Sequence, residues 1–144
     1  MRVVVQKCKD AKVTVKGQVV GAIPFGLVLL VAFTEKDTLE TIQWMVNKIV
    51  HLRIFEDQNG VMNLSLLDQK GSILSISQFT LYGNCDKGNR PSYQQALNKE
   101  EARKLYNLFN RELSRHIQVE QGKFGEEMEV SFVNLGPTTI LLER

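Results

Sequence analysis

The sequence has little of the residue types on which the commonest catalytic centres depend. Its 144 residues include two histidines, His51 and His116, and two cysteines, Cys8 and Cys85. These four residues are far apart, and none lies in a metal-binding or catalytic motif. A zinc site, a Ser-His-Asp triad and a Cys-His pair therefore have little support. The lack of a Gly-x-x-x-x-Gly-Lys-Ser/Thr segment excludes a P-loop site.

The sequence also lacks long apolar runs, a strong charge of one sign and closely spaced cysteines. The longest apolar run, at 27–33, is far shorter than the ~20 residues that span a bilayer. The first residues form a β-branched run without the pattern of a signal peptide. The isolated cysteines indicate reduced thiols. We therefore expect a soluble, cytoplasmic protein with no membrane partner. The net charge of +2 does not indicate a strongly basic nucleic-acid surface.

What the sequence does contain is the pattern of one α+β domain over residues 1–144, a usual length for a single domain. Apolar and polar residues alternate as in a hairpin over 12–23, and Pro24 and Gly26 follow it. The run at 27–33 is apolar on both faces, as in a covered central strand. Other strands are predicted at 2–8, 52–56, 61–64, 73–81, 117–120, 128–133 and 139–142.

Two segments have the spacing of amphipathic helices. The first begins after Asp37, the predicted cap, and its apolar positions continue to Leu52. The second covers about 99–115, with Asn98 as its cap and Glu101 as the reciprocal partner. A short helical turn is possible at 92–97. We therefore expect an antiparallel or mixed sheet with two main helices.

A candidate site follows from the strand predicted at 73–81. It is followed by 82–92, the longest loop, which is rich in Gly, Asn, Asp and Pro. Sites are commonly built on loops at the end of a buried strand, so the residues alone predict a site near Thr80. Taken alone, Gly136-Pro137 predicts a turn between two strands. The acidic pair Glu126-Glu127 predicts a solvated face.

Four motifs together are more specific than any one of them. They are Ser77-Gln78-Phe79-Thr80-Leu81, Lys87-Gly88-Asn89-Arg90-Pro91-Ser92-Tyr93, Gly122-Lys123-Phe124-Gly125 and Asn134-Leu135-Gly136-Pro137-Thr138-Thr139. In this order and spacing, the sequence resembles the D-aminoacyl-tRNA deacylases, which hydrolyse D-amino acids from mischarged tRNA. The resemblance extends over the whole chain.

The resemblance implies a homodimer of a deacylase-type fold, with each active site at the subunit interface. Ser77, Gln78, Phe79 and Thr80 would form one side. Gly136 and Pro137 of the partner subunit, joined by a cis peptide bond, would form the other. Their carbonyl groups would hold the α-amino group and exclude an L side chain, and a Cβ on the glycine would obstruct the ligand.

The resemblance also implies a reaction that needs neither a metal nor a cofactor. Backbone N–H groups near Phe79 and Thr80 would stabilise the oxyanion, at about 3–4 kcal/mol per donor, and Gln78 would orient the substrate or a water molecule. Thr80 is the one side chain suited to be a nucleophile, but no histidine is available to activate it. We therefore favour assistance by the terminal ribose hydroxyl of the tRNA, with Thr80 in a positional role.

Further residues are assigned by the same resemblance. Lys87, Arg90 and Lys123 are candidates for phosphate contacts, with solvated loop charge as the alternative. Phe124 and Met128 are candidates for contact with the adenosine or for the wall of the pocket. The expected partner is the acceptor end of an aminoacylated tRNA, and DNA is not expected. Glycyl-tRNA is a possible second substrate.

Two positions depart from the family pattern, and two other functions stay open. An acidic residue commonly precedes the Gly-Pro pair, where this chain has Leu135, and a small aliphatic residue often follows it, where this chain has Thr138. Both bear on the orientation of the pair. One alternative function is a non-catalytic module that binds an adenine nucleotide or an RNA end. The other is a broader editor that also accepts L-amino acids.

Overall fold

Two long antiparallel strands form the centre of the fold. In the computed structural model, which describes residues 1–144, β1 (Arg2–Val15) pairs with β2 (Gln18–Ala32) along almost their whole length. The separate strands and hairpin predicted at 2–8, 12–23 and 27–33 are therefore wrong in their boundaries. Pro24 and Gly26 do not end the strand, because Gly26 adopts a φ of 144° and β2 continues through it.

The other strands extend this hairpin into a mixed sheet of the order β6-β5-β2-β1-β7. Strand β5 (Ser72–Ser77) runs parallel to β2, and β6 (Val119–Gln121) runs parallel to β5. Strand β7 (Glu129–Glu143) is antiparallel to β1 and forms one edge of the sheet. The expected α+β class with a mixed sheet is confirmed.

The Gly136-Pro137 pair lies within β7 and not in a turn between two strands. On one side of it Asn134 pairs with Cys8, and on the other side Thr139 pairs with Gln6. Four residues of β7 thus face the single residue Lys7 and form a bulge. The turn predicted from sequence is wrong because both halves of β7 pair with the same strand, and an edge strand tolerates a bulge on its free side. The Gly136–Pro137 peptide bond is cis.

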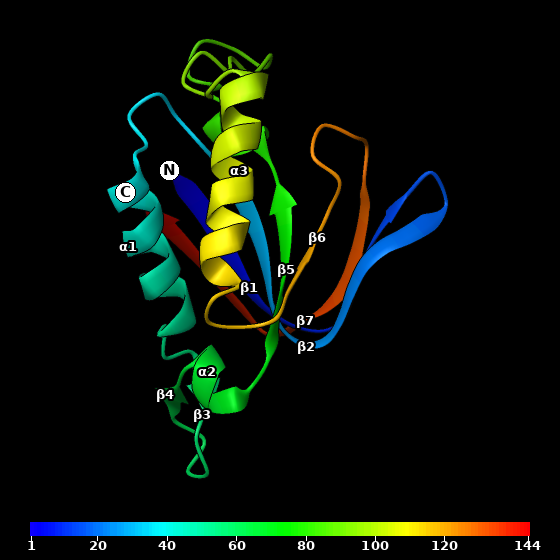
Figure 1. The fold of residues 1–144 in the computed structure, drawn as a ribbon, viewed down its shortest axis with the longest axis vertical. Coiled ribbons are helices and arrows are strands. Elements are labelled where there is room, and N and C mark those ends of the chain that lie inside the picture. Colours follow the sequence, from blue (N-terminus) through cyan, green and yellow to red (C-terminus); the bar gives the residue numbers. More distant parts are fainter.

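Two helices cover one face of the sheet (Figure 1). Helix α1 (Leu39–Val50) is capped by Thr38 and not by Asp37, whose carboxylate instead accepts the N–H of Thr34 at 2.8 Å and pairs with the Met1 amino group. Helix α3 (Lys99–Leu113) begins after Asn98, as predicted, and the Asn98 side chain accepts the N–H of Glu101 at 3.1 Å. The main core lies between these helices and the sheet.

Short elements fill the remaining connections. Strands β3 (Phe55–Glu56) and β4 (Met62–Leu64) form a small hairpin, close to the predicted strands at 52–56 and 61–64. The short helix α2 (Leu66–Gln69) was not predicted, because four residues give no helical period. Residues 92–97 form a turn and no helix. None of the helices combines the length and the apolar composition needed to span a bilayer.

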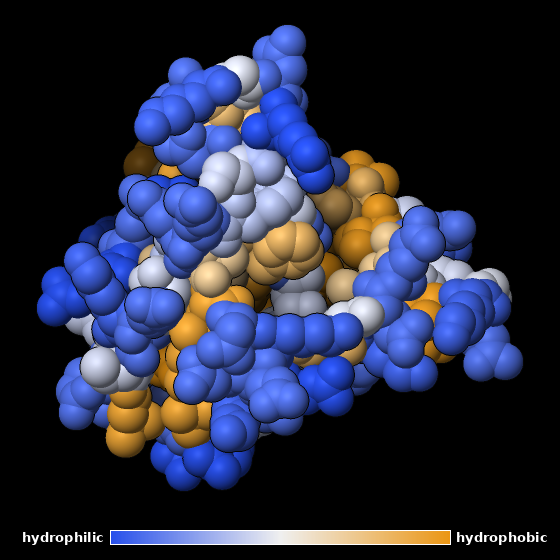
Figure 2. All heavy atoms as spheres, turned by 90° about the horizontal axis from the view of Figure 1, so that it is seen from above, coloured by the Kyte–Doolittle hydropathy of each residue, from blue (hydrophilic) through white to orange (hydrophobic).

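A second, smaller core lies on the other side of the sheet. It contains Cys8, Ala11, Val13, Ile23, Val28, Leu74 and Ile76. The far part of the β1–β2 hairpin extends away from the helical layer in Figure 1. Both cysteines are free thiols, and burial raises the pKa of Cys8 to about 11. In Figure 2, hydrophobic side chains are exposed in the hollows between hydrophilic projections.

Candidate active site

The candidate site begins where β5 ends. Strand pairing stops after Ser77, the N–H of Gln78 donates to the carbonyl of Val31 at 2.7 Å, and a 3₁₀ turn follows at Phe79–Tyr82. The strand predicted at 73–81 is therefore too long. In the turn, the N–H of Leu81 donates to the Gln78 carbonyl at 3.3 Å, whereas the N–H groups of Phe79 and Thr80 have no acceptor.

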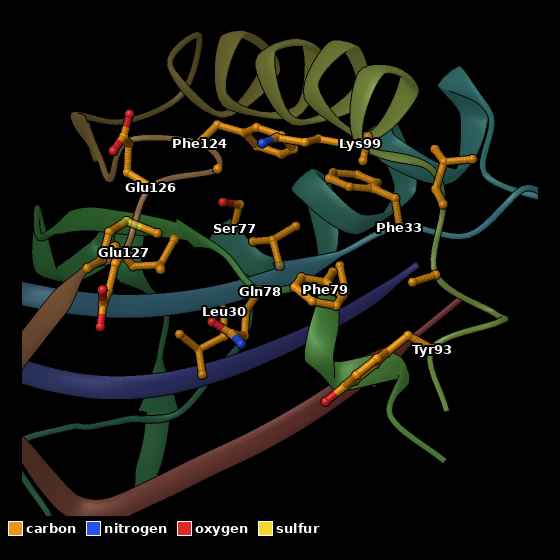
Figure 3. A pocket seen from close by; sticks show the side chains of 18 of the residues that line it. Leu30, Phe33, Ser77, Gln78, Phe79, Tyr93, Lys99, Phe124, Glu126 and Glu127 are labelled. Carbon is orange, nitrogen blue, oxygen red and sulfur yellow. The ribbon is translucent and has the colours of Figure 1, made fainter. Parts of the chain in front are cut away.

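A cavity of about 740 Å³ opens beside this turn. The ends of β2 and β5 form its floor, α3 covers it, and the loop 122–128 closes one side (Figure 3). Most of its lining is hydrophobic, which suits the base and the acyl group of a small organic ligand. The lining residues are Leu30, Val31, Ala32, Phe33, Ile76, Ser77, Gln78, Phe79, Tyr93, Ala96, Leu97, Lys99, Ala102, Phe124, Gly125, Glu126, Glu127, Met128 and Val130.

The loop 122–128 fits against the cavity because two of its positions are glycine. A Cβ at Gly122 would lie 2.5 Å from the Met128 sulfur atom, and a Cβ at Gly125 would lie 2.9 Å from Cε of Lys99. Gly125 also has a φ of +78°, which L side chains rarely adopt. The motif Gly122-Lys123-Phe124-Gly125 thus lets Phe124 and Met128 approach the cavity.

Five of the residues predicted from sequence meet at this cavity: Ser77, Gln78, Phe79, Phe124 and Met128. Thr80 lies next to them in the turn, is exposed, and accepts a hydrogen bond from the amide nitrogen of Gln78. The Gln78 side chain lies beside Leu30, and that of Ser77 lies between the sheet and the Phe124 loop (Figure 3).

The acidic pair of the loop lines the cavity, and Glu127 is exposed while Glu126 is partly buried. Glu126 pairs with Lys16 at 3.4 Å and more distantly with Lys123 at 4.0 Å. Glu127 forms no ion pair, although it lines the same cavity. Lys123 is thus engaged within the loop. The structure contains no group of three or more His, Cys, Asp or Glu side chains that could hold a metal ion.

The other predicted residues lie elsewhere in the chain. Lys87 and Arg90 line a second, polar hollow of about 270 Å³ in the loop after the 3₁₀ turn. Gly136 and Pro137 are exposed on β7, and two strands, β1 and β2, separate β7 from β5 in the sheet. A single chain therefore does not bring the Gly-Pro pair to the Ser77–Phe79 cavity.

Several residues at or beside this cavity were assigned no role from the sequence, although Tyr93 ends one of the four motifs. Tyr93 packs edge-on against Phe79, with 5.0 Å between ring centroids, and Lys99, the first residue of α3, lines the cavity. Arg103, one turn further along α3, lies 5.3 Å from the centroid of the Phe124 ring. The helical period of α3 predicts which residues face the core, but not that its first turn lies above a cavity.

A buried hydrogen bond links α3 to β5. The hydroxyl group of Tyr106 on α3 donates to the Ser75 carbonyl at 2.7 Å. Burial raises the pKa of Tyr106 above its ordinary value. The phenol therefore stays protonated at neutral pH and ties α3 to the strand that ends at Ser77.

Comparison with known sequences reveals close relatives. A family profile described as "D-Tyr-tRNA(Tyr) deacylase" matches residues 4–143. The "D-aminoacyl-tRNA deacylase" of Anoxybacillus flavithermus (strain DSM 21510 / WK1) is 56% identical over 144 residues, with 99% of each chain covered. The protein of the same name from Bacillus cytotoxicus is 54% identical, with the same coverage.

Solved structures have the same fold. The structure described as "c-Myc DNA Unwinding Element Binding Protein" superposes with a TM-score of 0.95 at 39% identity, and covers 100% of this chain and 99% of its own. A "probable eukaryotic D-amino acid tRNA deacylase" gives 0.84 at 20% identity, with 98% and 97% covered, and shows likeness of fold alone. Because the profile matches nearly the whole chain and the curated relatives are more than half identical to it, this chain belongs to the D-Tyr-tRNA(Tyr) deacylase family.

Proposed function

We propose that the protein hydrolyses the ester bond of D-aminoacyl-tRNA and releases the free D-amino acid and tRNA. The observation that carries this proposal is the cavity of about 740 Å³ whose rim contains Ser77, Gln78 and Phe79, with free backbone N–H groups at Phe79 and Thr80. The names of the close relatives support it. Residues 1–144 act as one deacylase domain.

The cavity suits the end of an aminoacylated tRNA in size and in lining. A pocket of several hundred cubic ångströms holds a nucleoside with an attached acyl group. Phe79, Tyr93 and Phe124 offer aromatic faces on which a base can stack, a contact worth about 1–3 kcal/mol per base. The tRNA acceptor end is thus the partner, and Lys87 and Arg90 contact its phosphates from the second hollow. We place the activity in the cytoplasm and assign no role to DNA.

Chiral selection in this proposal requires a second copy of the chain. An apolar row crosses the sheet from its edge to the cavity, through the register pairs Leu141–Val4, Val4–Leu30 and Leu30–Ile76. It lies on the face away from the helices, because Val3 and Val5 point into the helical core.

Leu141, at the edge of this row, is 57% exposed. A homodimer formed on this face covers the row and brings Gly136 and Pro137 of the partner subunit to the cavity. Main-chain carbonyl groups then hold the α-amino group and leave no room for an L side chain. Selection of this kind does not depend on side-chain identity, so many D-amino acids, and glycine, are accepted. Leu135 and Thr138 affect how the pair is oriented.

The proposed chemistry uses main-chain atoms and the substrate. Water adds to the ester carbonyl, and the N–H groups of Phe79 and Thr80 stabilise the oxyanion that forms. The C–O bond to the ribose then breaks, the ribose oxygen leaves with a proton, and the D-amino acid is released. The neighbouring ribose hydroxyl assists the transfer of this proton. Gln78 and Thr80 position the reacting groups, and neither a metal nor a cofactor takes part.

The experiment that tests the function compares D-Tyr-tRNA with L-Tyr-tRNA in the presence of a chelator. Loss of the ester from the D form alone supports both the deacylase and its chiral selection. Hydrolysis of both forms leaves a broader editor with an altered selector. If neither ester is hydrolysed above the uncatalysed rate, the proposal fails. Glycyl-tRNA in the same assay tests the second substrate.

Two further measurements test the parts of the proposal. In single-turnover reactions, Thr80→Ala should retain most of the wild-type rate, and a fall to background would show that the Thr80 hydroxyl takes part in the chemistry. Sedimentation at micromolar concentration should give a dimer, and Leu141→Asp should shift it toward the monomer. A wild-type monomer with full chiral selectivity would contradict the cross-subunit site.

A further inference from the structure

Two cations above the cavity converge on one point of the loop 122–125. Relative to the position that a Cβ would take at Gly125, Nζ of Lys99 lies at 3.2 Å and Nη2 of Arg103 at 3.8 Å. Because both distances end at the same point, the two nitrogen atoms are at most about 7 Å apart. Figure 3 shows the Lys99 side chain extending under α3 toward Phe124. The two cations are thus close enough to contact one anionic group.

Neither cation forms an ion pair within the chain. No carboxylate lies within 4.0 Å of the Lys99 or Arg103 nitrogen atoms, whereas Lys16 and Lys123 at the same loop both pair with Glu126. The acidic residues in the first turn of α3 are Glu100 and Glu101. The Glu101 carboxylate accepts a hydrogen bond from the Asn98 side-chain amide at 2.6 Å.

The local packing holds both side chains at the cavity edge. The Arg103 guanidinium lies 5.3 Å from the centroid of the Phe124 ring, and the Phe124 ring packs against that of Tyr106 at 5.7 Å. A guanidinium stacked on an aromatic face still presents its N–H groups at its edge. Gly125 leaves room for the stem of Lys99, since a Cβ there would lie 2.9 Å from Cε of Lys99. The absence of a side chain at 125 thus lets the lysine lie across the loop.

We propose that Lys99 and Arg103 together bind the phosphodiester group that joins the terminal nucleoside of the tRNA to the preceding nucleotide. This inference rests on the proposed function, in which the terminal nucleoside occupies the cavity below them. A phosphodiester carries one negative charge and two free oxygen atoms. A guanidinium can donate two parallel hydrogen bonds to such a group, and an ammonium adds a point charge.

The test uses a substrate with the phosphodiester and one without it. The variants are Lys99→Gln with Arg103→Gln, and Lys104→Gln as the matched control, because Lys104 is on the same helix, exposed, and outside the cavity. The substrates are D-tyrosyl-tRNA and the D-tyrosyl ester of adenosine, which has no phosphate. We expect the double variant to lower kcat/KM on the tRNA about tenfold more than on the nucleoside ester, mainly through KM.

Salt dependence gives an independent readout of the same contact. For wild type, log KM on the tRNA rises with log salt, and loss of one phosphate contact should lower that slope by about 0.7. Equal losses on the two substrates would mean that the pair only shapes the cavity. A double variant that behaves like Lys104→Gln on the tRNA would overturn the inference.

Failure of this inference can be separated from failure of the proposed function by a binding measurement. The dinucleotide CpA contains the phosphodiester and needs no turnover, and adenosine is its phosphate-free counterpart. We expect the double variant to weaken CpA binding about tenfold more than adenosine binding. If wild type hydrolyses neither ester, the proposed function fails, but this binding ratio still decides whether the cation pair recognises phosphate.

Discussion

Gly26→Ala should destabilise the protein far more than a glycine substitution elsewhere, because β5 packs directly against this position. A Cβ at Gly26 would lie 2.7 Å from the Ser72 nitrogen and 2.8 Å from its carbonyl carbon, both backbone atoms. An ordinary van der Waals contact begins at 3.4 Å. The start of β5 would therefore have to retreat from β2, at the first pair of a parallel register that continues to Val31–Ser77.

The magnitude follows from three contributions. Overpacking against rigid atoms costs about 2 kcal/mol, one weakened ladder hydrogen bond about 1 kcal/mol, and a non-glycine residue at positive φ about 1 kcal/mol. We expect the free energy of unfolding to fall by about 4 kcal/mol, a large part of the stability of a domain of this size. For a chain of this length, Tm should fall by roughly 8–16 °C.

Gly17→Ala is the matched control for this prediction. Gly17 also has a positive φ, +79°, but no atom lies within 4 Å of its Cβ position. It therefore isolates the conformational contribution, about 1 kcal/mol. Urea unfolding with a shared m-value compares the two variants. Equal losses of stability in the two variants would refute the steric argument.

Two further predictions concern buried groups. Tyr106→Phe removes one of the two donors to the buried Ser75 carbonyl, which still accepts the Gly122 N–H at 2.9 Å. The loss should be that of one hydrogen bond, about 1 kcal/mol in urea unfolding. Tyr93→Phe, at an exposed position, should change stability by less than about 0.5 kcal/mol, and equal effects would contradict the role of the buried hydrogen bond. The pKa of Cys8 is raised from 9.0 to about 11, so its contribution to stability is complete below pH 9 and is lost as the pH rises toward 11. We expect the free energy of unfolding to fall over this range by at most about 1.4 kcal/mol per pH unit, and an unchanged pH dependence in Cys8→Ala would exclude this thiol as the cause.

The parts of the fold that the sequence predicted correctly are those set by interactions between residues close together in the chain. The amphipathic period of α1 and α3 identifies their buried faces, and Asn98 caps α3 because its side chain accepts the N–H of Glu101. The β-branched run of β1 and the apolar run of β5 predict strands at these places, although the predicted boundaries differ from those of the structure. Four motifs of the sequence were sufficient to recognise the family, which the profile match and the close relatives confirm.

The errors occur where strand pairing overrides local signals. Pro24 and Gly26 resemble breaks in a strand, yet β2 continues through them because β1 pairs along both parts. Gly136-Pro137 resembles a turn, but both sides of it pair with β1. The opposite error, a strand predicted too long, occurs at 73–81. The apolar run that begins at Ile73 predicts a strand through Leu81. In the structure the partner strand β2 ends at Ala32, and the chain turns at Phe79.

The amino-acid sequence was sufficient to predict the α+β class, the two main helices and the motifs that the family shares. Those features depend on composition, on periodicity and on residue types in a short segment, all of which are visible along the chain. The three-dimensional fold was needed to show that Ser77, Gln78 and Phe79 share a cavity with Phe124 and Met128. It was also needed to show that the Gly-Pro pair of the same chain lies two strands away, and that Lys99 and Arg103 converge above the cavity. These relations join segments that are distant in sequence, and the register of the sheet and the packing of α3 against it set them.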